Sequence, residues 1–222
     1  MRNLFGNENL DSFKMDRREA VEILICIFTL ALAATIAFNP FGILIFLKPV
    51  PLLIFWIVFS FTIGVGFVLH ELSHKAVAVY YGASARFVMW PQGLAFMLLT
   101  SLFGFIFAAP GAVYIYAKSI TNKQNGIISI AGPAINLLLS FAFIFFQTLS
   151  KSQFGFGFDH FYGLNIWLFG AYINALLAAF NLLPIGPLDG AKVFRWSKLI
   201  WAGVFLFSLW LMFNLGGALI LG

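Results

Sequence analysis

The sequence predicts an all-α membrane protein, a polytopic helical bundle of about five to six spans with a short re-entrant or β-hairpin segment near residues 85–117. The first supporting observation is composition, because the chain of 222 residues is 62% hydrophobic and only 9% charged. A soluble domain carries about 25% charged residues. The second observation is that several apolar runs reach the ~20 residues needed to cross a bilayer. The third is that basic residues gather on one side of these runs.

The apolar runs cover roughly residues 20–47, 52–80, 127–149, 164–183 and 199–220. The first run is much longer than the apolar part of a signal peptide, so it predicts an uncleaved membrane anchor. The single cysteine, Cys26, excludes an internal disulfide. No soluble segment interleaves basic and aromatic residues, so we expect no nucleic-acid partner.

Residues 94–117 are apolar but interrupted at Pro110 and Gly111, so this segment either spans the membrane or enters and leaves on one side. With a cytoplasmic N-terminus and no span here, eleven basic residues are inside and only Lys48 and Lys151 are outside. With a span, the split becomes seven to six. Because cytoplasmic loops are enriched in Lys and Arg, the first arrangement is favoured. We therefore predict a multi-pass protein of the cell membrane with a cytoplasmic N-terminus.

Histidine and acidic residues are rare in this chain, yet His70, Glu71 and His74 form an H-E-x-x-H motif near the end of the second run. Residues i and i+4 share one helix face, so the two imidazoles can bind one zinc ion. Glu71 is turned by about 100° from His70, which suits it to take a proton from a water on the metal. The alternative is a pair of packing histidines beside a glutamate, although a buried unpaired carboxylate is costly.

A zinc hydrolase normally supplies three protein ligands, and the sequence offers Asp159, His160 and Asp189 as the third. In the favoured topology the runs at 52–80 and 164–183 both cross inward, so Asp189 reaches the depth of the two motif histidines. Asp159 and His160 fall in the opposite loop, across most of a ~30 Å hydrocarbon core. The sequence therefore predicts Asp189 as the third ligand.

The stretch NLLPIGPLDG (residues 181–190) predicts a helix broken at membrane depth, because its prolines and glycines cannot continue a regular helix. Such breaks occur where they line a cavity or are covered by protein. Two amides in the apolar runs, Asn136 and Asn181, either hydrogen-bond to neighbouring helices or hold the substrate backbone or oxyanion. Both interpretations stay open.

These motifs together resemble the site-2 protease family of intramembrane zinc metalloproteases, peptidase family M50. The matching elements are HELSH, the Asn181, Pro184, Asp189 and Gly190 positions of NLLPIGPLDG, and Gly132-Pro133 leading to Asn136 in AGPAIN. The resemblance covers about residues 52–190. It implies one zinc ion per chain held by His70, His74 and Asp189, with Glu71 as the catalytic acid/base.

The resemblance also implies a zinc metalloendopeptidase that hydrolyses peptide bonds in or near transmembrane segments of other membrane proteins. We expect residues 1–19 to be a cytoplasmic segment, residues 20–222 to be one transmembrane metalloprotease domain, and the partners to be transmembrane substrates and the bilayer. The segment 85–117 either pairs with an extended substrate or dips passively into the membrane. The rival function is a divalent metal-ion transporter using the same His/His/Asp site, although no inverted repeat is evident.

Overall fold

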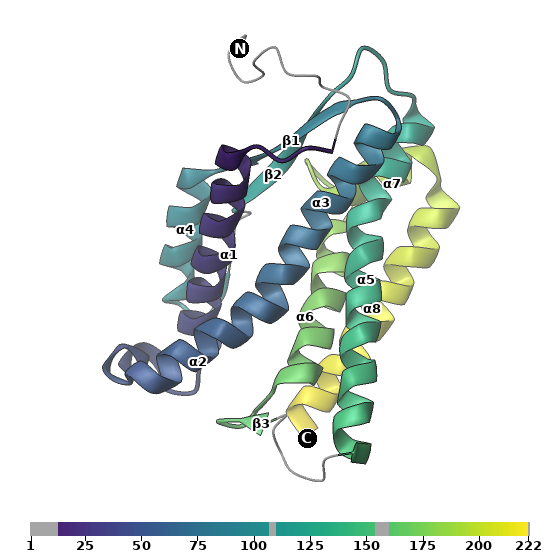
Figure 1. Ribbon diagram of the computed structural model, residues 1–222. Helices are drawn as coiled ribbons and strands as arrows, with labels where there is room; N and C mark the ends of the chain where they lie inside the picture. The colour runs from purple at the N-terminus through teal and green to yellow at the C-terminus, as the bar shows by residue number, and fades with distance from the viewer. Residues whose placement is uncertain (1–12, 107–109, 154–159, 222) are drawn as a thin grey trace.

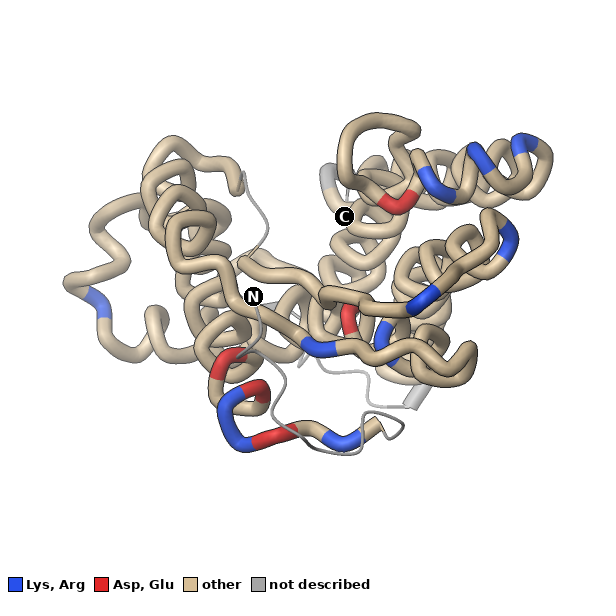
Figure 2. The backbone as a smooth tube through the Cα atoms, turned by 90° about the horizontal axis from the view of Figure 1, so that it is seen from above, with Lys and Arg blue, Asp and Glu red and all other residues tan. Residues whose placement is uncertain are grey.

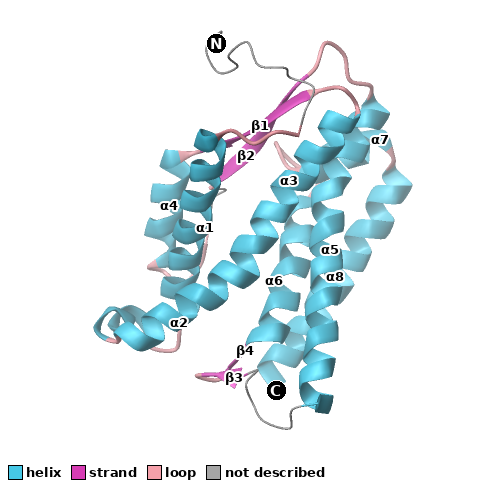
Figure 3. Ribbon diagram, in the orientation of Figure 1, coloured by secondary structure: helices cyan, strands magenta, loops and turns pink. Residues whose placement is uncertain are grey.

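The computed structural model describes residues 13–106, 110–153 and 160–221. The described residues form a helical bundle with one two-stranded sheet at one end and a second, very short strand pair at the other (Figures 1 and 3). The predicted all-α membrane fold with a short β segment is therefore confirmed. Four helices are long and apolar enough to cross a membrane: Arg17–Phe38, Pro49–Tyr80, Asn122–Ser150 and Lys198–Leu219.

The first apolar run is not one uninterrupted helix, so the expectation of a single span over 20–47 is wrong. Helix α1 (Arg17–Phe38) begins at Asp16, whose carboxylate accepts the Glu19 N–H at 2.7 Å. It ends at Asn39-Pro40, where proline cannot continue a helix. A 3₁₀ turn, η1 (Gly42–Leu47), then leads into the next helix.

The second run is a continuous helix made of α2 (Pro49–Phe59), a π-helical turn η2 (Ser60–Gly64) and α3 (Val65–Tyr80). Single π turns inside α-helices occur frequently at functional sites. Helix α3 carries the H-E-x-x-H motif, and His70 lies ten residues before its end at Tyr80. At 1.5 Å per residue, the motif begins about 15 Å from that end of the helix.

The ambiguous segment returns to the end of the bundle from which it started. Strand β1 (Ser84–Met89) pairs antiparallel with β2 (Gly111–Tyr116), and Ser84 lies opposite Tyr116. Between the strands, helix α4 (Pro91–Ser101) packs along α1 (Figure 1). The sequence predicted the strands but not the helix between them.

The described residues of the second half of the chain supply four helices that pack together. The elements are α5 (Asn122–Gln153), β3 (His160–Phe161), β4 (Leu164–Asn165), α6 (Ile166–Asn181), α7 (Asp189–Trp196) and α8 (Lys198–Leu221). Helix α6 contributes to two apolar clusters, one shared with α1, α2 and α3 and one shared with α5 and α8. It therefore joins the two halves of the bundle beside η2 and the start of α3.

One end of the bundle holds most of the charge. The starts of α1, α5 and α8 and the end of α3 lie together there, beside the β1–β2 sheet (Figure 1). Among the described residues this end carries Lys14, Arg17, Arg18, Lys75, Arg86, Lys118, Lys123, Lys192, Arg195 and Lys198. Lys48 and Lys151 belong to the opposite end. The relative sides thus match the arrangement in which residues 94–117 do not span.

Candidate metal centre

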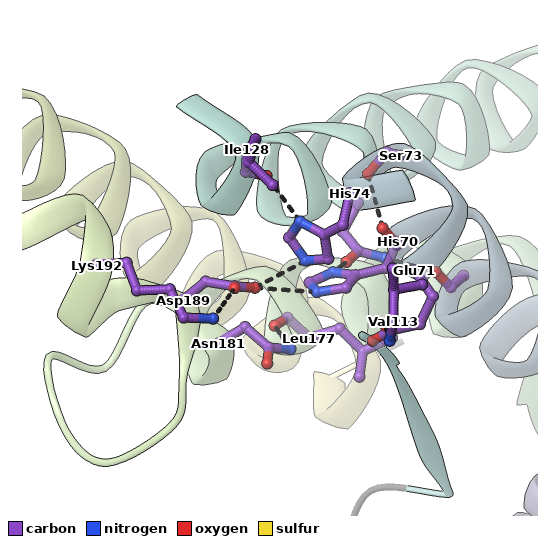
Figure 4. A network of polar contacts seen from close by, with 12 residues as sticks. His70, Glu71, Ser73, His74, Val113, Ile128, Leu177, Asn181, Asp189 and Lys192 are labelled. Carbon is purple, nitrogen blue, oxygen red and sulfur yellow. Dashed lines mark hydrogen bonds and ion pairs between the residues drawn. The ribbon is translucent and has the colours of Figure 1, made fainter. Parts of the chain in front are cut away.

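Three side chains from α3 and α7 converge in a buried position. His70 and His74 share one face of α3, with ring centroids 4.7 Å apart. Their Nε2 atoms lie 3.2 and 3.0 Å from Asp189 Oδ2 (Figure 4). The ligand atoms of the three residues all lie within 4.8 Å of one another, and each residue is buried. The candidates chosen from charge and spacing are therefore brought together.

The broken stretch after α6 explains how Asp189 reaches the histidines. Helix α6 ends at Asn181, and Gly186 adopts a positive φ of 55° that favours glycine. The chain then turns back so tightly that a side chain at Gly190 would collide with the Leu182 backbone. Trp201 Nε1 donates to the carbonyl oxygen of Leu182 at 2.7 Å and fixes this turn. Asp189 consequently opens α7 with its carboxylate facing α3.

Both histidines present the same ring nitrogen to the site. Nδ1 of His70 lies 2.5 Å from Asn136 Oδ1, and Nδ1 of His74 lies 2.7 Å from the carbonyl oxygen of Ile128. These oxygens only accept hydrogen bonds, so each Nδ1 carries the proton and each Nε2 keeps a lone pair. The Asn136 amide is oriented by its own donors, which reach Gly66 O at 3.1 Å and Asn174 Oδ1 at 2.9 Å.

The converging atoms fit a metal cation. Two imidazole lone pairs and a carboxylate oxygen meet with no proton donor between them, and such electron-pair donors repel one another unless a cation lies among them. Histidine and carboxylate donors suit zinc, and the Nδ1 hydrogen bonds are the support that metal-bound histidines usually have. Gly132 of α5 keeps the adjoining space open, because a Cβ there would lie 2.5 Å from both Nε2 atoms.

Glu71 and Lys192 complete the surroundings of the three donors. Glu71 is half-buried, and its Oε2 accepts the backbone N–H of Val113 in β2 at 2.8 Å (Figure 4). Lys192 Nζ lies 3.4 Å from Asp189 Oδ1, the carboxylate oxygen that does not face the histidines. The site therefore contains three candidate metal ligands. Beside them lie the Glu71 carboxylate, held by strand β2, and the Lys192 cation.

Comparison with known proteins identifies the family. The model of peptidase family M50 matches residues 58–164 and 158–204, which is more than half of the chain. The chain belongs to peptidase family M50. It is therefore a zinc metalloprotease, and its cofactor is one zinc ion.

Curated relatives within family M50 agree with this assignment. A protein of Methanocaldococcus jannaschii named "Putative zinc metalloprotease MJ0611" is 38% identical over 208 residues, covering 90% of this chain and 98% of the relative. "Putative zinc metalloprotease YwhC" of Bacillus subtilis is 31% identical over 150 residues, 60% of this chain and 65% of the relative. "Zinc metalloprotease MJ0392" of M. jannaschii is 26% identical over 143 residues, 64% of this chain and 34% of the relative. No solved structure matches.

The remaining candidates from the sequence are placed differently. Asn136 is fully buried, and its amide is engaged with His70. Asn181 is half-buried at the end of α6, where its Nδ2 donates to Leu177 O at 2.9 Å. His160 begins β3 at the opposite end of the bundle (Figure 3), and Asp159 lies outside the described residues.

Sequence analysis missed the supporting groups around the metal centre. Asn174 of α6 is fully buried and accepts a hydrogen bond from Asn136 Nδ2 at 2.9 Å. Gly66 adjoins the Asn174 amide so closely that a Cβ would collide with it. A buried amide facing a glycine on another helix is the signal that could have been sought. The Ile128 carbonyl and the Val113 N–H are backbone groups and leave no such signal.

Proposed function

We propose that this zinc metalloprotease hydrolyses peptide bonds in or near the transmembrane segments of other membrane proteins. In this proposal His70, His74 and Asp189 hold the zinc ion, and Glu71 is the general acid/base. The observation that carries the proposal is the burial of three convergent donors inside a bundle of membrane-spanning helices. A metalloprotease site so placed is reached most directly by a chain that is itself in the bilayer.

The protein residues supply positioning and proton transfer. When bound, zinc supplies a Lewis acid that lowers the pKa of water and polarises the scissile carbonyl. Glu71 takes the proton of the attacking water as the new C–O bond forms. Glu71 then gives this proton to the leaving nitrogen as the C–N bond breaks. The Val113 N–H holds Oε2 of Glu71, so the carboxylate keeps its orientation through both transfers.

Strand β2 is the candidate platform for an extended substrate. Phe87 of β1 lies opposite Val113 of β2 in the sheet. The Phe87 N–H donates a hydrogen bond to Glu19, and the Val113 N–H donates one to Glu71. These two residues therefore form a pair whose backbone groups point away from the partner strand. The backbone of Gly111 and Ile115, which share the parity of Val113, faces the same outer edge. A locally unwound substrate could add to this edge by β-augmentation.

Asn136 and Asn181 differ as candidates for contact with the substrate. All polar contacts of Asn136 lie inside the protein, so we assign it to the support of His70. Asn181 has one remaining amide hydrogen and lies half-buried near Asp189 (Figure 4). It remains the better candidate for holding the substrate backbone or oxyanion.

We also propose the orientation and extent of the domain. The end that carries the β1–β2 sheet and most basic residues faces the cytoplasm of a cell-membrane protein, because cytoplasmic loops are enriched in Lys and Arg. Residues 1–19 form the cytoplasmic N-terminal segment, and residues 20–222 form one transmembrane metalloprotease domain.

To test this function, purified protein in neutral detergent micelles is incubated with a panel of single-span membrane proteins. Each cut site is then mapped by mass spectrometry. We expect cleavage in or near the transmembrane segment and about one zinc ion per chain. Asp189→Asn should lose both zinc and cleavage, because a neutral amide is a poor ligand for zinc. His160→Ala, which removes a rejected ligand candidate, should keep both.

Two results would overturn the proposal. Cleavage confined to soluble segments far from the membrane would show a metalloprotease with a different substrate class. Full zinc occupancy in Asp189→Asn would show that another residue completes the site.

A further inference from the structure

A group of basic residues next to the metal centre forms a surface that we call the basic rim. Its members are Lys118, Lys123, Lys192, Arg195 and Lys198, all exposed except the half-buried Lys192. They come from the β2–α5 connection, the first turn of α5, helix α7 and the start of α8. The ends of α5 and α7 touch, because a Cβ at Gly126 would lie 2.5 Å from Trp196 Cβ. The start of α5 and the end of α7 therefore adjoin, and the residues of the basic rim gather at this end of the bundle.

The charge of the basic rim is not compensated within the described part of the chain. Three acidic residues at the start of α1 each form an ion pair with a basic residue outside the rim. These pairs are Asp16 with Arg86 at 3.2 Å, Glu19 with Lys75 at 2.7 Å and Glu22 with Arg18 at 2.9 Å. Asp189 is the one described acid beside the rim, and it faces the histidines and Lys192. Seen from above, acidic and basic stretches adjoin near α1, whereas basic stretches predominate on the other side (Figure 2).

Two members of the rim occupy positions that are unfavourable for helix stability. Lys123 lies in the first turn of α5, and Lys198 is the first residue of α8. A helix N-terminus carries a partial positive charge, so a cation there opposes the macrodipole. The macrodipole therefore does not favour either lysine, although Lys198 Nζ also lies 5.4 Å from the centroid of the Phe194 ring. Instead, each lysine adds its charge to the partial positive charge of a helix N-terminus. The resulting positive potential favours contact with a negatively charged partner.

The basic rim continues from the proposed substrate platform. Strand β2 ends at Tyr116, and Lys118 follows two residues later. From Val113, which holds Glu71, to Lys118 is about 17 Å at 3.3 Å per residue. A peptide paired along β2 with its scissile bond beside the metal centre would therefore extend its flank over the rim.

We propose that the basic rim selects membrane substrates whose flank on this side of the membrane is acidic and rejects those whose flank is basic. This inference rests on the proposed cleavage of transmembrane substrates. Most membrane proteins carry Lys and Arg on their cytoplasmic flanks. A basic rim on that side repels this majority, and such built-in repulsion is a common source of specificity.

Three synthetic peptides test the proposal in neutral detergent micelles. They share one transmembrane segment and differ only in a flank of three Asp, three Ser or three Lys residues. Wild-type protein should cut the Asp peptide with a kcat/KM about tenfold above that of the Lys peptide, since several exposed ion pairs act together. In about 0.5 M salt this ratio should fall to about threefold, because exposed charges are screened. Binding of the same peptides to Glu71→Gln protein should show the same order without cleavage.

A charge-reversal variant supplies the decisive comparison. Lys118→Glu/Lys123→Glu/Lys198→Glu should invert the preference between the Asp and Lys peptides while the zinc content stays at the wild-type value. Lys192 is left in place because it contacts Asp189. Glutamate is favourable in the first turn of a helix, so two of the three changes should not weaken folding. The matched control is Lys14→Glu/Arg17→Glu, which reverses exposed bases at the start of α1 and should keep the wild-type preference.

The possible results separate the two proposals. If wild-type protein cuts no peptide but the Glu71→Gln protein binds the Asp peptide more tightly, the intramembrane activity fails and the basic rim inference stands. Equal binding of all three peptides overturns the rim inference whether or not they are cut. A preference that arises only when anionic lipid is added also overturns it, because the rim then contacts lipid and not the substrate.

Discussion

At each edge of the β1–β2 sheet one backbone N–H donates to a carboxylate, but the charges of the two carboxylates are compensated differently. On the β1 edge, the Phe87 N–H donates to Glu19 at 2.9 Å. On the β2 edge, the Val113 N–H donates to Glu71 at 2.8 Å. Glu19 is 2% exposed, and both of its oxygens lie 2.7 Å from Lys75 Nζ. Glu71 is half-buried, and no basic side chain in the described ranges pairs with it.

This difference distinguishes a structural carboxylate from one that can transfer protons. Lys75 pairs with Glu19 and ties α1 to α3, so Glu19 acts as a structural carboxylate. The groups that orient Glu71 and the two histidines are neutral: the Val113 N–H for Glu71, Asn136 for His70 and the Ile128 carbonyl for His74. Such neutral partners orient the side chains and set the tautomer of each histidine without placing a cation against a lone pair that could bind a metal ion. The predictions below test this division.

The largest expected effect is on the β2 edge, from Glu71→Gln. Glutamine has nearly the same volume and can still accept the Val113 N–H, but it cannot take a proton at neutral pH. Loss of a positioned general acid/base lowers the rate by about 10²–10⁴-fold. Zinc content and thermal stability should stay at wild-type values, measured by metal analysis and by unfolding in micelles. A variant that cuts as fast as wild type would remove Glu71 from the mechanism.

The next effect is on the β1 edge, from Glu19→Gln, and concerns stability. The change leaves Lys75 as a buried charge without its partner, which costs about 3–5 kcal/mol of unfolding free energy. Protein that remains folded should still bind zinc and keep its kcat. Equilibrium unfolding in mixed micelles measures the loss, and a kcat per zinc-loaded molecule measures the chemistry.

Glu22→Gln is the matched control for the β1 edge. Glu22 also accepts a strand N–H, from Met89 at 3.0 Å, but the side chain of its partner Arg18 is 72% exposed. Water can solvate the Arg18 guanidinium when its partner is neutral, so the free energy of unfolding should fall by about 1 kcal/mol or less. If Glu19→Gln were as mild as Glu22→Gln, the buried ion pair would not be what ties α1 to α3.

The convergence of His70, His74 and Asp189, the proposed zinc ligands, could be predicted from the sequence because local and global signals agree there. Helical spacing pairs His70 with His74, and the apolar runs together with the distribution of basic residues selected Asp189. The role of Glu19 could not be predicted in this way. Its partners Lys75 and Phe87 are 56 and 68 residues away in the sequence. Neither periodicity nor charge counting reports such long-range contacts.

The remaining differences from the sequence-based picture also have local causes. The first apolar run breaks at Pro40 although its hydropathy continues, so hydropathy alone overestimated the length of the helix. Helix α4 begins at Pro91, and proline is a favoured first residue of a helix. It lies inside a segment that was interpreted from its β-branched and aromatic ends.

The smallest expected effect tests the neutral support of the metal side, through Asn136→Ala. This change removes the acceptor of the His70 Nδ1–H, so His70 is free to change its tautomer and its ring orientation. Loss of such a supporting partner typically weakens metal binding by about 10–100-fold. We expect a zinc dissociation constant raised by that factor, measured by competition with a chelator. Cleavage should recover when excess zinc is supplied.

Ser140→Ala separates this support from ordinary packing between the same helices. Ser140 lies on α5 four residues after Asn136, is equally buried, and donates to Ala171 O of α6 at 2.8 Å without touching a ligand. Its loss should lower stability by about 1 kcal/mol and leave the zinc dissociation constant unchanged. If both variants weaken zinc binding equally, Asn136 acts only through helix packing. If Asn136→Ala alone weakens it, the neutral amide of α5 orients the ligand on α3, as Val113 orients Glu71.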